Sequence, residues 1–188
     1  MELLYLWIDK YKNIEKQGFN FSSQYRFDYN PESGELKVEE NPNHIAGFFP
    51  DGISNVTAII GENGAGKSNL LEFIKASFSW SVFESPDSII SITKEKEVYK
   101  ICYGYNLSKN FHLANHTKLE FEEIPLIKRV NNGFSILYKN EKVIINGYSP
   151  IIFYSNVVDL KNESNPPQLH EINISTNYLI QELTKEWC

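Results

Sequence analysis

Residues 61–68 of the chain have the types and spacing that bind the phosphates of a nucleotide: Gly61, four residues, then Gly-Lys-Ser. Glycines let the backbone turn tightly, so that its N–H groups point at phosphate oxygens. Lys67 brings a positive charge to the β- and γ-phosphates, and the Ser68 hydroxyl can ligate Mg²⁺. The pattern predicts binding of ATP with Mg²⁺, with Lys67 as the catalytic group, through Gly64, Ala65, Gly66, Lys67, Ser68 and Asn69.

The segments on either side of this loop indicate which elements position it. Residues 55–60 are β-branched and end in two isoleucines, which predicts a buried strand. After the loop, Leu70, Ile74 and Phe78 fall four apart and predict an amphipathic helix over residues 66–80, whose N-terminus favours anions. The alternative is a glycine-rich turn with Lys67 as a solvated surface charge. The agreement of both flanks with the loop disfavours it.

Alternating apolar residues predict that most of the remaining chain is β-structure. Turn residues separate the segments, including 30–34 and a hairpin tip at 139–142. A last helix is expected from about residue 175 to the end. The fold class that follows is α/β with a mostly antiparallel β layer. The predicted strands are 3–9, 19–29, 36–39, 88–93, 97–104, 117–123, 134–139, 142–146 and 150–155.

The amino-acid composition limits which binding partners and which cellular location are expected. The 188 residues include 12 Phe and 11 Tyr and carry a formal net charge of −6, which suits a β-rich globular domain. Only Arg26 and Arg129 are arginines, which argues against a large phosphate-tracking surface. Cys102 lies in an apolar run and is expected in the core; with Cys188 it forms no zinc spacing, so a cytoplasmic location is expected. No run approaches the roughly 20 apolar residues of a membrane helix.

Nucleotide hydrolysis needs further acidic groups that this chain does not offer in the usual pattern. A strand ending in Asp or Asp-Glu normally holds Mg²⁺ and polarises water. Residues 119–123 are amphipathic instead, and 157–159 are too short. His112 and His116 are four apart without a third ligand and are interpreted as surface residues. We therefore expect very slow or no hydrolysis by this chain alone.

Four features together resemble the ATPase heads of the SMC, DNA-repair and OLD-type group within the ABC-like class. The loop carries Asn63 before its second glycine, and about sixty β-rich residues precede it. Residues 6–14 resemble that group's opening strand, whose basic residue reaches the nucleotide; this implies nucleotide-binding roles for Lys12 and Asn13. Residues 151–159 resemble the strand and loop that end the first lobe. A Gln that contacts Mg²⁺ usually stands there, and Ser155 or Asn156 occupies the place, which makes Ser155 a candidate metal ligand.

The resemblance implies a P-loop NTPase fold, with an ATP-binding N-terminal lobe over residues 1–160. Residues 161–188 would form a polar loop and a C-terminal helix that leads into a missing insertion or second lobe. In the family, that lobe carries the signature motif, the acidic strand and the switch histidine. Two heads would sandwich two ATP molecules as a homodimer or larger assembly, acting on DNA in repair or antiviral defence, often alongside a nuclease.

Two other functions compete with this interpretation. A non-enzymatic regulatory module would use nucleotide occupancy only to switch a partner interface, and the missing catalytic parts favour it for this chain. A small-molecule kinase would use the same loop for phosphoryl transfer. It would need an arginine-rich lid, which two arginines in 188 residues make improbable.

Overall fold

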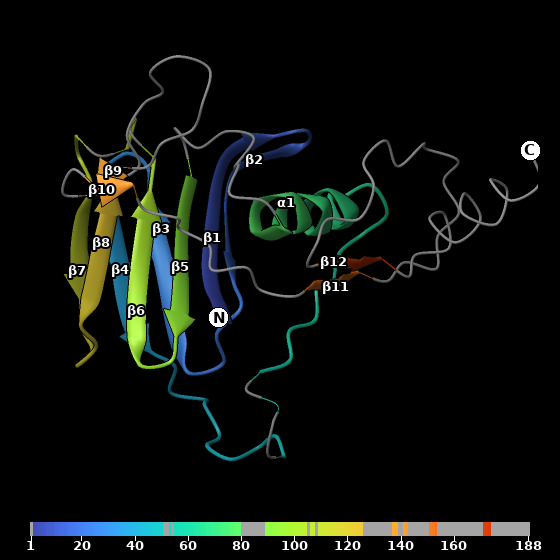
Figure 1. Cartoon of the computed structure of the whole chain (residues 1–188), viewed down its shortest axis with the longest axis horizontal. Helices are drawn as coiled ribbons and strands as arrows, with labels where there is room; N and C mark the ends of the chain where they lie inside the picture. The colour runs from blue at the N-terminus through green and yellow to red at the C-terminus, as the bar shows by residue number, and fades with distance from the viewer. Residues whose placement is uncertain are drawn as a thin grey trace, which may run out of the picture.

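The computed structural model describes residues 2–50, 53, 55–79, 89–104, 106–107, 109–125, 137–138, 141–142, 151–153 and 171–173. Within them the protein is mixed α/β, with mostly antiparallel sheets. A three-stranded sheet, a five-stranded sheet and helix α1 (Lys67–Ser79) stack as three layers (Figure 1). Helix α1 therefore packs on one face of the middle layer.

The middle layer is a five-stranded sheet in the order β2-β1-β5-β6-β8. Neighbouring strands are antiparallel except β6 and β8, which are parallel. Because Tyr11 pairs with Ile14, the β1–β2 hairpin turns through only two residues, Lys12 and Asn13. The bounds of the strands are β1 (Glu2–Tyr11), β2 (Ile14–Asn20), β5 (Ile89–Glu95), β6 (Val98–Tyr103) and β8 (Phe121–Pro125).

The outer sheet contains β3 (Tyr25–Asn30), β4 (Glu35–Glu40) and β7 (His112–Asn115). β3 and β4 form an antiparallel hairpin, and β7 adds to β4 in parallel. Along β3, Tyr25, Phe27 and Tyr29 are buried and alternate with exposed residues, because successive side chains of a strand point to opposite faces. The buried face packs on the five-stranded sheet.

Strand β1 is buried on both faces because it lies in the middle layer. Tyr5 and Trp7 face the outer sheet, whereas Leu6 and Ile8 face α1. The pairing of β1 with β5 shifts register between Leu3 and Tyr5. Leu4 belongs to the same cluster as its neighbour Tyr5, an arrangement that a β-bulge at this point permits.

The predicted strand over residues 19–29 is wrong in one respect, because the chain breaks there between two sheets. β2 ends at Asn20 and β3 begins at Tyr25. Between them, the buried Ser22 Oγ accepts the backbone N–H groups of Gln24 and Tyr25 at 3.2 and 3.0 Å. This local turn moves the chain from the middle to the outer sheet, which a continuous alternation of aromatic residues does not reveal.

The predicted strand over 117–123 also covers a turn. Asn115 Oδ1 accepts the Thr117 N–H at 2.9 Å, and Asn115 Nδ2 donates to Leu119 O at 2.7 Å. β8 starts only at Phe121, and sequence reasoning missed β7. The strand predictions at 3–9, 36–39, 88–93 and 97–104 are confirmed, with ends that differ by one or two residues.

Two small pairs of strands complete the described chain. β9 (Leu137–Tyr138) and β10 (Glu141–Lys142) confirm the predicted hairpin, and β11 (Ile151–Phe153) pairs in parallel with β12 (Glu171–Asn173). Within 161–188 the structure describes only β12, so the predicted last helix lies outside the described residues. None of the helical residues described forms a segment long and apolar enough to cross a membrane.

Candidate functional site

The loop that precedes α1 has the backbone geometry its glycines predict. Gly64 and Gly66 have φ of 85° and 95°, a left-handed region that side chains disfavour. Helix α1 begins at Lys67, and its first backbone bond runs from the Leu70 N–H to Gly66 O at 2.8 Å. The predicted helix over 66–80 is therefore confirmed within one residue at each end.

The N-terminal turn of α1 leaves a run of backbone donors available to a ligand. The Ala65 N–H donates to Glu62 O at 3.2 Å. The N–H groups of residues 66–69 have no acceptor in the part of the chain that the structure describes. Because the first turn of a helix holds unpaired donors and the positive end of its dipole, this turn suits an anion.

Lys67 lies across the mouth of the loop. Its Nζ donates to the carbonyl oxygens of Gly61 and Glu62, at 2.7 Å each. The side chain thus folds back over the loop, and its ammonium is bonded to neutral oxygens. An anionic phosphate is a stronger acceptor for this cation than a carbonyl, so a bound phosphate can draw it away.

The β1–β2 turn brings the sequence-predicted Asn13 to the same loop. Asn13 Nδ2 donates to Gly64 O at 2.8 Å, and Asn69 Nδ2 donates to Asn13 Oδ1 at 2.6 Å. Sequence reasoning named both asparagines, and the structure joins them. They come from opposite sides of the loop, 56 residues apart in the chain.

Lys12 lies next to the loop but is paired with the helix. Its Nζ lies 2.5 Å from Glu72 Oε2 and 5.2 Å from the centre of the Tyr11 ring. The hydrogen bond to Glu72 raises the pKa of Lys12 above its usual value. Sequence reasoning missed Glu72; its place three residues after Asn69 on the helix was the available signal.

Buried contacts fix the helix, and through it the loop, against the sheet. Leu70 and Phe73 are buried against Leu6, Ile8 and their neighbours. The Phe73 ring meets Tyr11 edge-on, with centroids 4.9 Å apart. The loop therefore lies at the end of β1, beside the turn that carries Lys12 and Asn13.

The predicted buried strand over residues 55–60 is wrong. These residues form no strand, and no described strand pairs with them. Side chains tether the segment instead, because Asn55 and Thr57 both donate to Phe21 O. Ile59 packs against the core beneath α1, but Ile60 is 91% exposed. β-branched composition alone does not make a strand when no neighbour supplies the backbone hydrogen bonds.

The remaining predicted ligands lie on the surface or beyond the described chain. Asn63, Ala65 and Ser68 are exposed. Ser155 lies outside the described residues, so its predicted contact with Mg²⁺ stays a prediction. Among the described residues, no three His, Cys, Asp or Glu side chains form a metal-binding group. An exposed Ser68 beside unpaired donors still fits Mg²⁺ that arrives with its phosphates, because Mg²⁺ keeps few protein ligands.

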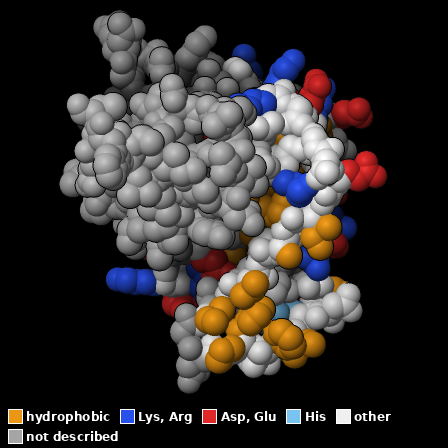
Figure 2. Space-filling model, turned by 90° about the vertical axis from the view of Figure 1, so that its right-hand side faces the viewer, with side chains coloured by type: hydrophobic (Ala, Val, Ile, Leu, Met, Phe, Trp, Pro, Cys, Tyr) orange, Lys and Arg blue, Asp and Glu red, His pale blue; other side chains and the backbone are white. Residues whose placement is uncertain are grey.

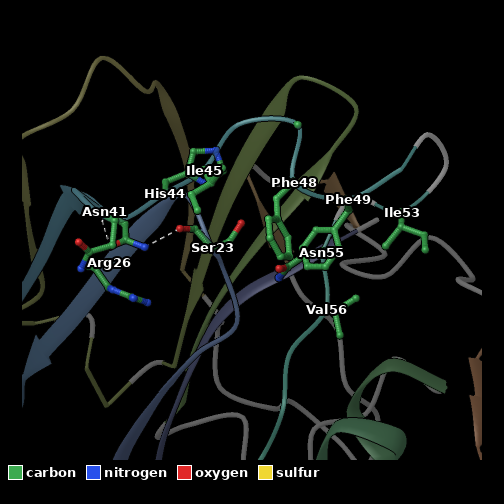
Figure 3. A pocket seen from close by; sticks show the side chains of 12 residues that line it. Ser23, Arg26, Asn41, His44, Ile45, Phe48, Phe49, Ile53, Asn55 and Val56 are labelled. Carbon is green, nitrogen blue, oxygen red and sulfur yellow. Dashed lines mark hydrogen bonds between the residues drawn. The ribbon is translucent and has the colours of Figure 1, made fainter.

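A separate hollow of about 360 Å³ lies where the chain leaves β4 (Figure 3). Two of its side-chain amides are bonded within the protein, Asn41 Nδ2 to Ser23 O at 2.7 Å and Asn55 Nδ2 to Phe21 O. In Figure 2, hydrophobic side chains, drawn in orange, gather in the lower part of the view. The wall of the hollow is mixed: the exposed apolar side chains Ile45, Phe48, Ile53 and Val56 share it with polar side chains that include Arg26 and His44.

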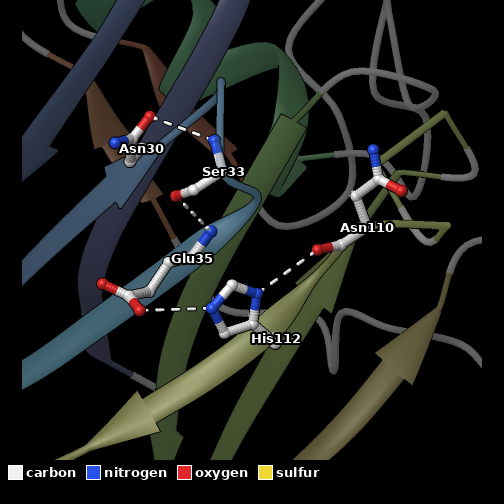
Figure 4. Close-up of polar contacts among 5 residues, drawn as sticks. All are labelled: Asn30, Ser33, Glu35, Asn110 and His112. Carbon is white, nitrogen blue, oxygen red and sulfur yellow. Dashed lines mark hydrogen bonds and ion pairs between the residues drawn. The ribbon is translucent and has the colours of Figure 1, made fainter.

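Among the described residues, His112, His116 and Cys102 do not form a second site. His112 Nε2 lies 3.2 Å from Glu35 Oε2, and its Nδ1 lies 3.4 Å from Asn110 O (Figure 4). Both His112 and His116 are exposed, as predicted. Cys102 is buried in the core, also as predicted, and burial raises the pKa of its thiol to about 12. A protonated thiol is a poor nucleophile.

No family model, no curated protein and no solved structure matches the chain. The interpretation of the site therefore depends on its residues and their geometry.

Proposed function

We propose that this chain is the ATP-binding N-terminal lobe of a P-loop NTPase of the SMC and OLD-like, ABC-type group. The observation that supports this most is the loop before α1. Two glycines with positive φ precede a helix whose first N–H groups are unpaired in the described chain, and a lysine lies over them. This combination suits the β- and γ-phosphates of a nucleotide.

The start of α1 and Lys12 supply the groups that would bind the nucleotide in this proposal. The N–H groups of residues 66–69 would bind phosphate oxygens, and Lys67 would leave the Gly61 and Glu62 carbonyls to join them. Ser68 would ligate Mg²⁺, which neutralises phosphate charge when it is bound. Lys12 would join the phosphates from the β1–β2 turn by exchanging Glu72 for a nucleotide.

The biological setting rests on the family resemblance of the sequence. The intact protein would dimerise, or assemble further, around two ATP molecules. It would act on DNA in repair or antiphage defence, with a nuclease as a partner, in the cytoplasm. This chain alone would turn over ATP very slowly or not at all.

Calorimetric titration of Mg·ATP into the whole chain tests the proposal. Lys67→Ala removes the loop cation, and Lys37→Ala is a matched control, because Lys37 is a half-buried lysine of the outer sheet paired with Glu39. We expect Lys67→Ala to weaken binding about 10- to 100-fold, as for a charged hydrogen bond, and Lys37→Ala to leave it unchanged. No binding by a folded wild-type chain contradicts the proposal.

A regulatory module that binds nucleotide without turnover is the second candidate. In the described chain, Lys67 and Asn13 donate to loop carbonyls and Asn69 donates to Asn13, and no carboxylate belongs to that set. A water needs a base or an orienting group to attack a phosphate. ATP-dependent association with a partner, without turnover, would support this candidate. Turnover that Lys67→Ala abolishes would contradict it.

A small-molecule kinase remains the least favoured function. It predicts transfer of ³²P from labelled ATP to a small acceptor. The same titrated sample, incubated with labelled ATP and candidate acceptors, tests this directly. We expect no labelled product.

A further inference from the structure

We propose that Asn13 is a positioning residue that holds the phosphate loop in its ligand-ready conformation before any nucleotide binds. This inference rests on the proposed function of the loop. It concerns a residue whose side chain need not touch the nucleotide, because its contacts are to the loop itself.

The side chain of Asn13 bonds the loop with one end of its amide and helix α1 with the other. Its Nδ2 donates to Gly64 O at 2.8 Å, and its Oδ1 accepts from Asn69 Nδ2 at 2.6 Å. Gly64 lies in the turn, and Asn69 lies in the first turn of α1. One side chain thus connects the loop to the helix that follows it.

The peptide between Gly64 and Ala65 is held on both sides. Its carbonyl accepts from Asn13, and its N–H donates to Glu62 O at 3.2 Å. A flip of this peptide would break both bonds. The flip is otherwise easy, because Gly64 has no Cβ and nothing lies within 4 Å of where one would stand.

Asn13 also fills the space beside Gly66. A Cβ built on Gly66 would lie 2.9 Å from Asn13 Oδ1 and 3.3 Å from its Nδ2. The amide therefore packs directly on the bare backbone of that glycine. This contact opposes movement of the loop toward the β1–β2 turn.

The turn that carries Asn13 is anchored in the core on both sides. Asn13 is one of two residues between the paired Tyr11 and Ile14, both of which are buried against α1. Its neighbour Lys12 has a φ of 51°, a conformation kept only where the surroundings enforce it. Asn13 thus connects the exposed loop to a turn that is anchored in the core.

Amide hydrogen exchange of the nucleotide-free chain tests the proposal. Asn13→Ala removes both bonds. Asn13→Asp keeps the shape and the acceptor for Asn69 but cannot donate to Gly64 O. Asn20→Ala is the matched control, because Asn20 at the other end of β2 makes two amide bonds to the backbone of Phe27, remote from the loop.

We expect the exchange rates of the bonded loop amides, above all the Ala65 N–H that donates to Glu62 O, to rise about 3- to 10-fold in both Asn13 variants, because the peptide between Gly64 and Ala65 loses its bond to Asn13. Asn20→Ala should leave those rates unchanged even where it lowers global stability, because loops exchange by local opening. Wild-type exchange in Asn13→Asp would mean that Asn13 only fills space and would overturn the proposal. If Asn13→Ala does not fold, Asn69→Ala must show the same loop-specific effect for the proposal to stand.

Mg·ATP titration of the same variants separates this proposal from the proposed function. We expect Asn13→Ala to weaken binding about 3- to 10-fold, because a loop that is not preorganised must be ordered by its ligand. A wild-type chain that binds no ATP refutes the proposed function, yet the exchange data still decide the role of Asn13. ATP binding with unchanged exchange in the Asn13 variants refutes the role of Asn13 alone.

Discussion

The two-sheet core and the segment from residue 55 to residue 69 are built by different means. In the core, strand β1 has neighbours in the sheet on both edges and buried side chains on both faces. The loop segment has no strand partner among the described residues, and Ile60 is 91% exposed where Leu6 is fully buried. Side-chain amides, from Asn13, Asn55 and Asn69, tie the segment to the rest of the molecule.

This contrast indicates how a rigid scaffold can carry a binding loop. Apolar burial is non-directional and strong, so it fixes the position of α1. Hydrogen bonds are directional and individually weak, so they fix the orientation of single peptides in the loop. A loop held in this way can leave its backbone N–H groups available to a ligand. In a strand, the same groups would be bonded to the neighbouring strand.

The largest expected effect comes from the side chain that links the two regions. Phe73→Ala removes a buried ring from between α1 and the sheet, which should cost about 3–5 kcal/mol of unfolding free energy. Leu71→Ala is the control on the same helix, because Leu71 is 45% exposed. It should cost well under about 1 kcal/mol. Urea denaturation measures both, and equal losses would contradict the assigned packing of α1.

Alkaline pH should weaken the core through its buried tyrosines. Burial, followed by the neighbouring Tyr99, raises the pKa of Tyr25 to about 12, whereas an unfolded tyrosine ionises near 10. The unfolded chain therefore loses this proton first. The stabilisation is fully present below pH 10 and is lost as the pH rises from about 10 to 12, by roughly 2 kcal/mol. Urea denaturation between pH 8 and 11.5 should show a shallower loss in Tyr25→Phe; parallel curves would contradict this.

The two loop glycines should respond unequally to alanine. Gly64→Ala meets only backbone strain, because nothing lies within 4 Å of the position its Cβ would take, and should cost about 1 kcal/mol. Gly66→Ala adds a contact of 2.9 Å with Asn13 Oδ1 and should cost roughly 1–3 kcal/mol. Thermal unfolding and loop amide exchange measure the difference. A milder effect at Gly66 than at Gly64 would mean that Asn13 does not pack on the loop.

The smallest effect on stability is expected at Lys12 and Glu72. Their side chains are 42% and 53% exposed, so breaking this ion pair should change the unfolding free energy by less than about 1 kcal/mol. ATP binding should distinguish them, because only Lys12 can meet a phosphate. We expect weaker binding in Lys12→Ala and not in Glu72→Ala. Equal ATP affinities of the two variants would mean that Lys12 pairs with α1 and does not contact the nucleotide.

Much of the core was predictable because apolar runs and apolar–polar alternation can be recognised within short stretches of the sequence. The apolar run of β1, the alternation along β3 and the helical spacing after Lys67 all predicted what forms. The breaks were not predictable from alternation. Ser22 and Asn115 form turns between strands by bonding backbone groups within four residues, and the alternation of apolar residues continues across both turns.

For the candidate site, the sequence indicated which residues could take part but not how they are arranged. The motif named residues 61–69, and the resemblance of residues 6–14 named Asn13, which the structure brings to Gly64. The spacing of Glu72 from Asn69 places both on one face of the helix, but its pairing with Lys12 depends on how α1 packs against the sheet. The strand predicted at 55–60 does not form for a similar reason. A strand needs a second segment to pair with, and the sequence of one segment does not show whether a partner is available.

Amide hydrogen exchange of the whole chain, with and without Mg·ATP, tests the central claim most directly. We predict that ATP slows exchange at residues 61–69 and at the β1–β2 turn, and that strands β1 and β5 keep their rates. The same experiment on Lys67→Ala should show little protection at the loop. Unchanged exchange at 61–69 under saturating ATP, or protection confined to other parts of the chain, would contradict the claim that this loop binds the nucleotide.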